Sequence, residues 1–72
     1  MDDSQNGRGG PMAQWRHDLR DAVATTVLSS SAARMGLDRD NPELTRIALA
    51  RIDTACARCI KLLEQMPQWP PT

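Results

Sequence analysis

The sequence contains no phenylalanine and no tyrosine, and its aromatic residues are two tryptophans. A hydrophobic core must therefore be built from tryptophan, methionine and the aliphatic side chains. The chain has 72 residues, which allows one small domain. A core of that size is marginal and usually needs a disulfide, a metal or a partner subunit. The composition is nevertheless 40% hydrophobic and 25% charged, which is typical of a globular protein.

The chain also has no net charge, no long apolar run and a single lysine. A net charge of zero removes the long-range attraction to nucleic acid that strongly basic proteins have. No apolar run approaches the ~20 residues needed to cross a bilayer, and the acidic start MDDSQNGRGG does not resemble a signal peptide. We therefore expect a cytoplasmic protein with no membrane partner. Lys61 is the only lysine, and this bias toward arginine suggests a bacterial or phage genome rich in GC.

The residues that most enzymes use are scarce as well. His17 is the only histidine, and no G-x-S-x-G, P-loop or H-E-x-x-H motif occurs. The serines at 29–31 have no base nearby in the sequence. We therefore expect no catalytic residues, no enzymatic activity and no cofactor.

The only cysteines, Cys56 and Cys59, form a C-x-x-C pair inside a predicted helix. A redox pair normally lies at a helix N-terminus, where the dipole activates the thiol, and these residues lie about four turns further on. Zinc needs four ligands, of which the pair supplies half. We interpret both as buried apolar residues. A zinc site, completed by a second copy of the chain, is the alternative.

Apolar residues recur at spacings of three and four from Pro11 to the region of Gly36, which predicts a first helix. Pro11 suits the first helical position, and Gly36 is expected to end the helix in the left-handed conformation, with Leu37 folding back. The stretch ATTVLSSS contains poor helix formers. A kink at 29–31 is therefore a possible feature of this helix, and a strand at AVATTVL is a weaker alternative.

A second helix is predicted from Pro42 to Met66. Asn41 can cap its N-terminus, Pro42 suits the first position, and Glu43 faces the positive end of the helix dipole. Pro67 should end it. Its apolar positions alternate spacings of three and four and share one face; they are Leu49, Ile52, Cys56, Cys59, Leu63 and Met66.

Two helices with a short connection pack as an antiparallel hairpin, so the predicted fold is all-α. Residues should lie level when their numbers sum to roughly 77, which places Met12 and Trp15 beside Leu62, Leu63 and Met66. The expected organisation is a flexible tail at 1–10, a hairpin domain at 11–66 and an extended, proline-rich tail at 67–72. Trp69 is expected either to pack on the open end of the hairpin or to contact a partner.

The second helix has a wider apolar arc than one partner helix can cover, which predicts an interface. We expect a homodimer that forms a four-helix bundle, and a regulatory protein-binding module that acts as an adaptor, chaperone or inhibitor. The expected self-association residues are Leu28, Met35, Leu49, Ile52, Cys56 and Leu63, and the expected partner contacts are Arg51, Arg58 and Trp69.

DNA binding is a second hypothesis for the function. If the first helix broke at the serines, the segment SSAARMGLDRDNPELTRIALARI would imitate a helix-turn-helix motif. Nucleic acid is nevertheless the less expected partner, because acidic residues interleave the basic ones along both predicted helices.

Overall fold

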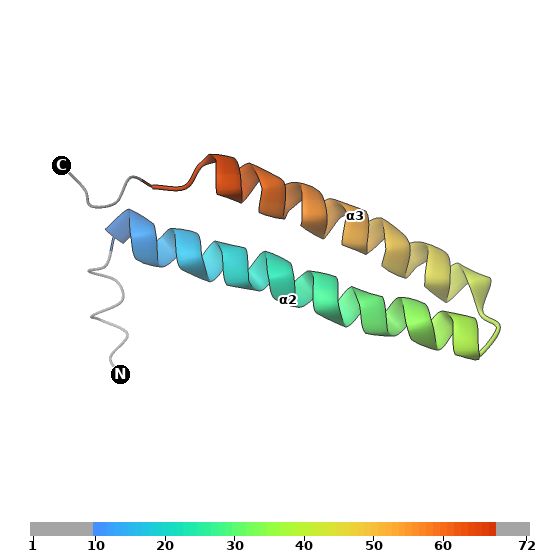
Figure 1. The fold of residues 1–72 in the computed structure, drawn as a ribbon. Coiled ribbons are helices and arrows are strands. Elements are labelled where there is room, and N and C mark those ends of the chain that lie inside the picture. The colour runs from blue at the N-terminus through green and yellow to red at the C-terminus, as the bar shows by residue number, and fades with distance from the viewer. Residues whose placement is uncertain (1–9, 68–72) are drawn as a thin grey trace, which may run out of the picture.

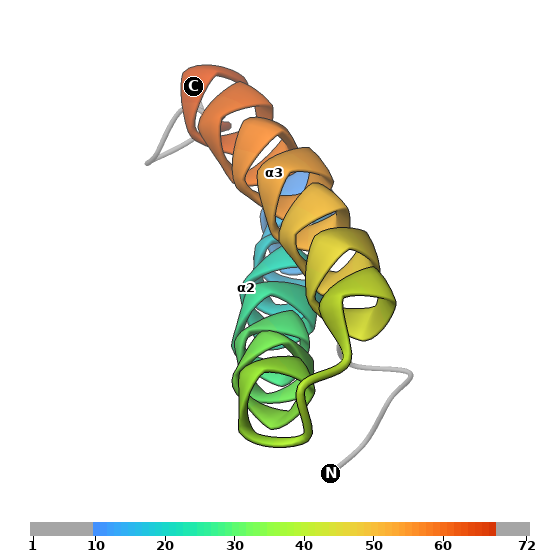
Figure 2. The same cartoon turned by 90° about the vertical axis from the view of Figure 1, so that its right-hand side faces the viewer.

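The computed structural model describes residues 10–67 and consists of two antiparallel helices (Figure 1). Helix α2 spans Gly10–Asp38 with 29 residues, and helix α3 spans Pro42–Glu64 with 23 residues. Viewed from the connecting loop, α3 is inclined across α2 (Figure 2). The prediction of an all-α hairpin is confirmed. Most of the predicted tails, including Trp69, lies outside the described residues.

Helix α2 runs without a break through the three serines at 29–31. The weak helix formers before them satisfy their hydroxyls within the helix: Thr25 Oγ1 donates to the Asp21 carbonyl and Thr26 Oγ1 to the Ala22 carbonyl, each at 3.0 Å. Threonine hydroxyls that bond back to the carbonyl of the preceding turn are compatible with a continuous helix, although this bonding adds no helix stability. The strand alternative and a break at the serines are therefore wrong, and Figure 1 shows α2 as one continuous helix.

The prediction that Gly36 ends the first helix is wrong. Gly36 is a buried residue inside α2, which continues to Asp38, and Leu37 is exposed rather than folded back. The left-handed conformation falls on Asp40, whose φ is 53°. Glycine is needed at position 36 for another reason: a Cβ there would lie against Thr45 Oγ1 and 2.8 Å from the Thr45 backbone nitrogen. The residue lets the two helices approach each other beside the loop.

The start of α3 follows the predicted signals. The Asn41 side chain accepts a hydrogen bond from the Leu44 backbone N–H at 3.1 Å, with proline at the first helical position and Glu43 in the first turn. Thr45 Oγ1 donates to the Ala33 carbonyl oxygen at 3.4 Å, which links the first turn of α3 to α2. The cap by Asn41 on α3 and the contact of Thr45 with α2 together fix how the chain turns from α2 into α3.

Small side chains fill the contact between the helices. The buried residues of α2 are Ala22, Ser29, Ala33 and Gly36, and those of α3 are Ala48 and Ala55. Several recur every seven residues, which keeps them on one face of each helix as the pair runs its length. Among residues 10–67, no large side chain is fully buried. The hairpin therefore has a tight seam but little hydrophobic core of its own.

The two ends of the seam are closed differently. At the loop end, Gly36 and Thr45 are in contact. At the open end, the Trp15 indole N–H donates to the Leu62 carbonyl oxygen at 2.6 Å. The predicted level pairing of Trp15 with Leu62 is therefore confirmed. Neither described helix combines the length and apolar character required of a membrane span.

Candidate protein-interaction surfaces

Large hydrophobic side chains lie outside the seam, along both helices. Those with more than about two fifths of their surface exposed are Val23, Val27, Leu28, Met35, Leu37, Ile47, Leu49, Ile60, Leu63 and Met66. The seam of small residues divides this set between two sides of the hairpin. Each side is a candidate surface, and the two differ in charge.

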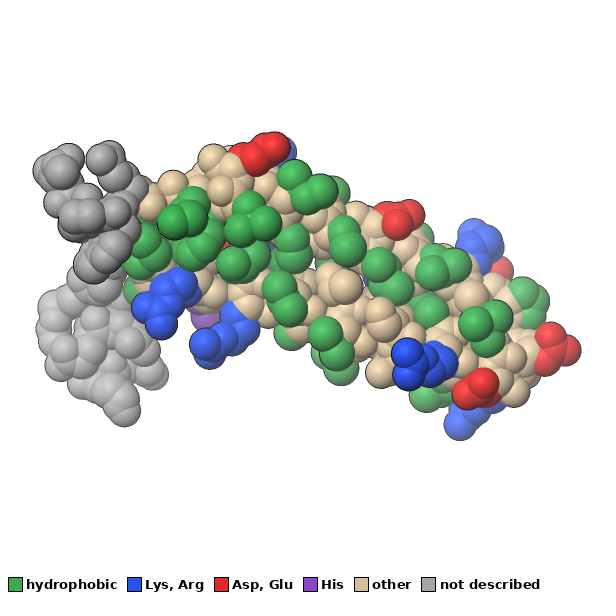
Figure 3. All heavy atoms as spheres, viewed as in Figure 1, with side chains coloured by type: hydrophobic (Ala, Val, Ile, Leu, Met, Phe, Trp, Pro, Cys, Tyr) green, Lys and Arg blue, Asp and Glu red, His purple; other side chains and the backbone are tan. Residues whose placement is uncertain are grey.

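The first side is apolar along its length. Leu49, Cys56 and Leu63 recur every seven residues and form one exposed row on α3, with Ile60 beside them. On α2, Leu37 lines the same hollow of about 280 Å³ as Leu49, so their rows face the same way. Hydrophobic side chains spread over both helices on the face seen in Figure 3.

We call this surface the apolar face and define it by its exposed members on the two helices, with charged side chains mainly at its margins (Figure 3). The members are Val23, Leu37, Leu49, Cys56, Ile60 and Leu63. Ile52 is half-buried at its inner edge. The face therefore includes most of the residues that the sequence predicted for self-association on the second helix.

Leu28 and Met35, the other two predicted self-association residues, lie on the opposite side. Leu28 is 70% exposed and borders a hollow of about 120 Å³ with Ile47 and Arg51. Seven residues separate Leu28 from Met35, so both follow the same line along α2. The predicted set is thus split between two surfaces that one partner helix cannot cover together.

The prediction of two buried cysteines is wrong within the single hairpin. Cys56 is exposed and Cys59 is half-buried. The seam runs through Ala48 and Ala55 rather than through the larger apolar residues, and this turns Cys56, one position beyond Ala55, out of the contact. In residues 10–67, no cluster of three or more His, Cys, Asp or Glu side chains is arranged to hold a metal ion.

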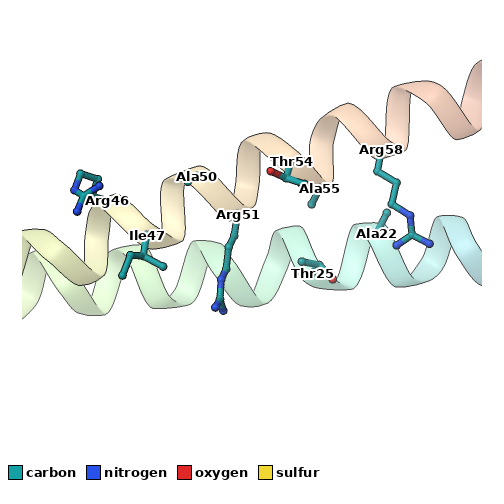
Figure 4. Close-up of a pocket in the computed structure, with 9 residues that line it drawn as sticks. All are labelled: Ala22, Thr25, Arg46, Ile47, Ala50, Arg51, Thr54, Ala55 and Arg58. Carbon is teal, nitrogen blue, oxygen red and sulfur yellow. The ribbon is translucent and has the colours of Figure 1, made fainter.

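The second side carries a groove with arginines along it (Figure 4). We call it the arginine groove. Its volume is about 450 Å³, and its lining residues are Ala22, Thr25, Arg46, Ile47, Ala50, Arg51, Thr54, Ala55 and Arg58. Helix α3 runs in the opposite direction across Figure 4 from its direction in Figure 1, with α3 above α2 in both, so the groove lies on the back of the apolar face.

The arginines of this groove differ in their ionic partners. Arg58 Nη1 lies 2.9 Å from Asp21 Oδ2, and Arg58 Nη2 lies 3.9 Å from Asp18 Oδ1. Arg46 Nη2 lies 2.6 Å from Glu43 Oε1, one turn away on the same helix. Within the described part of the chain, no carboxylate lies at ion-pair distance from Arg51.

Arg51 and Arg58, predicted as partner contacts, therefore share one groove, although Arg58 is already paired across the helices. The side chain of His17, the only histidine, is 77% exposed, and its Nδ1 lies 3.6 Å from Asp18 Oδ1. The break at the serines that a helix-turn-helix motif would require does not occur in α2.

Sequence reasoning missed Ile47, which lines the groove beside Arg51, and it missed the seam itself. The signal for the seam was the recurrence of small residues at intervals of seven, at Ala22, Ser29 and Gly36 on one helix and at Ala48 and Ala55 on the other. Comparison of the chain with protein-family models, with curated proteins and with solved structures finds no match. The two surfaces are therefore the features from which a function can be inferred.

Proposed function

We propose that the protein is a non-enzymatic protein-interaction module that self-associates through the apolar face. The single observation that carries this proposal is the mismatch between core and surface: alanine makes up the buried hydrophobic residues, whereas Leu49, Ile60 and Leu63 are each more than half exposed. Contiguous apolar surface of this kind usually marks an interface. A chain this short also gains little stability from its own core.

The arrangement that buries this surface most simply is a pair of hairpins packed face to face. Rows of apolar residues spaced by seven suit the packing of helices in a four-helix bundle. A two-fold axis would bring the same row of each copy into the interface, which requires a self-complementary surface. The apolar face suits that requirement because the exposed leucine and isoleucine side chains of one copy can pack on those of the other.

Burying the exposed half of one leucine is worth on the order of 1 kcal/mol. Burying several leucine and isoleucine side chains in each copy offsets the translational, rotational and side-chain entropy that association costs. Adaptor, chaperone or inhibitor activity toward another protein would then use the surface that self-association leaves open.

The test of this proposal places a carboxylate in the apolar face. Leu49→Glu and Leu63→Glu, made separately, should lower the mass measured by light scattering from twice the 8.0 kDa chain mass to that of one chain. A glutamate in a packed apolar interface loses its hydration without gaining a partner. Leu63→Ala, a milder change, should weaken the association without abolishing it.

The matched control is Leu28→Glu, which makes the same change at an exposed leucine on the opposite side of the hairpin. It should leave the mass unchanged. If Leu28→Glu dissociates the protein while Leu49→Glu does not, the interface lies on the other side. If neither changes the mass, self-association does not use either surface. Circular dichroism should show the same helix content in all variants.

A further inference from the structure

The arginine groove continues beyond its central hollow and is long enough to hold several turns of helix. Its lining on α3 extends from Arg46 to Arg58, about 18 Å at 1.5 Å per residue. The smaller hollow lined by Leu28 and Leu44 adjoins it through the shared residues Ile47 and Arg51. This shape is a channel along two helices, open to solvent, rather than an enclosed chamber for a small ligand.

The floor of the groove is made of small residues, and its walls present carbon. Ala22 and Ala55 are buried where the helices meet, and Thr25, Ile47 and Thr54, which line the same groove, are exposed (Figure 4 labels all five). Large side chains of a third helix can enter such a depression between two helices, as ridges enter grooves in helix packing. Amphipathic helices commonly bind apolar grooves in this way.

Charge then selects among such helices. The groove lining contains three arginines and no acidic residue. Arg58 is paired with Asp21 and Arg46 with Glu43, whereas Arg51, between them, is the one arginine of the groove lining with no carboxylate at ion-pair distance in the described residues. An arginine in this position favours a carboxylate opposite it, with which it can form a bidentate pair.

From these observations we propose that the arginine groove binds an amphipathic helix of another protein, one that carries an apolar stripe and a single acidic residue facing Arg51. The bound helix would complete a three-helix bundle on the side opposite the apolar face. The proposal goes beyond self-association and does not require it, because the two surfaces lie on opposite sides of the seam.

Other occupants fit the groove less well. Nucleic acid binding draws most of its affinity from several phosphate contacts, and of the three arginines that line this groove only Arg51 has no carboxylate partner in the described residues. A second copy of the chain fits less well because the carboxylates on this side of α2, those of Asp18 and Asp21, already pair with Arg58 of their own copy. They are therefore not free to pair with Arg51 of the other copy. A single acid on an otherwise apolar helix matches the one uncompensated charge.

The test uses three synthetic peptides, each about four helical turns long and identical in a stripe of leucine and alanine on a glutamine background. They differ at one position flanking the centre of the stripe, which is Glu, Gln or Lys. Fluorescence anisotropy of labelled peptides measures their dissociation constants for the full chain. The Glu peptide should bind about fivefold more tightly than the Gln peptide, the upper range for a solvent-accessible ion pair, and the Lys peptide most weakly.

Variants of the chain locate the contact. Arg51→Gln should abolish the differences among the three peptides, and Arg51→Glu should reverse their order. Arg34→Gln removes the same charge from an exposed arginine that does not line the groove and should change nothing. Thr54→Trp, which narrows the groove, should weaken the binding of all three peptides to the same extent.

The proposal is overturned if no peptide binds, if the three bind equally, or if Arg34→Gln and Arg51→Gln have the same effect. It is also overturned if a short DNA duplex binds more tightly than the Glu peptide and loses affinity in Arg51→Gln. Light scattering on Arg51→Glu separates this proposal from self-association: an unchanged mass supports a groove for another protein, and dissociation shows that the groove is an interface between copies.

Discussion

The indole N–H of Trp15 donates a hydrogen bond of 2.6 Å to the main-chain carbonyl oxygen of Leu62, 47 positions further along the chain. This bond joins the beginning of α2 to the last turn of α3, at the end of the hairpin away from the loop. Leu62 O also accepts from the Gln65 backbone N–H at 3.1 Å. The indole therefore adds a second donor to a carbonyl at a helix end, where acceptors are often left unpaired.

Trp15→Phe should remove this bond while keeping an aromatic ring in place. We expect a loss of about 0.5–1 kcal/mol in the free energy of unfolding, the lower part of the range for a hydrogen bond, because Leu62 O keeps its other donor. Urea denaturation followed by circular dichroism measures it, at a fixed protein concentration. Trp15→Leu should lower the free energy of unfolding further, because it also removes the aromatic ring. Equal stability of Trp15→Phe and the parent chain would show that the bond contributes nothing.

Gly36→Ala distinguishes the need for close helix approach from a simple preference for helix formers. Replacing glycine by alanine in an unconstrained helix interior stabilises it by roughly 0.5–1 kcal/mol. At this position the new Cβ would collide with Thr45, so we expect destabilisation of about 1–3 kcal/mol. Thermal unfolding at fixed concentration gives the sign of the change.

The control for that experiment is Ser31→Ala, an exposed position in the same helix. Because alanine is the better helix former, this variant should be slightly more stable than the parent chain. If Gly36→Ala were stabilised as Ser31→Ala is, the seam would not be as close at the loop end as Thr45 and Gly36 indicate.

Cys56 provides a chemical probe of the apolar face. Its thiol is exposed in the single hairpin, and self-association through the apolar face would cover it. In a Cys59→Ala background, the rate at which a disulfide reagent labels Cys56 should fall as protein concentration rises. Leu63→Glu should restore fast labelling at every concentration. A rate that is independent of concentration in the parent chain would argue against association through this face.

Local signals and segment lengths made the architecture predictable from the sequence. Asn41 followed by Pro42 and Glu43 marked the start of α3, and the side-chain cap is formed as expected. Once the connection was placed, the antiparallel geometry fixed the pairing of Trp15 with Leu62. The cap depends on a few neighbouring residues, and the level pairing depends on the constant rise per residue of two helices. Neither requires knowledge of side-chain packing.

The rotation of the helices about their own axes could not be obtained from hydrophobicity. Apolar periodicity predicts a contact centred on the large apolar residues of the second helix, whereas the buried residues of α3 in the seam are Ala48 and Ala55. Here α2 and α3 approach each other closely instead of burying large side chains, and this depends on how the two helices fit together. The same close approach explains why Gly36 lies inside a helix instead of at its end.

The candidate site was predictable in part for the same reason. Arg51 and Arg58 could be chosen from the sequence as neighbours on one helix surface. That Asp21 neutralises Arg58, that Ile47 joins the groove and that Leu28 faces away from Leu49 all follow from how α2 and α3 are rotated against each other. Those relationships required the tertiary structure.

The molecular mass of the unaltered chain in solution tests the central claim most directly, because the claim is that one hairpin cannot cover its own hydrophobic residues. Sedimentation equilibrium, run from low to high micromolar concentration, should give a mass that rises toward twice 8.0 kDa. A mass of 8.0 kDa at every concentration, in a chain that stays helical and soluble, would contradict it.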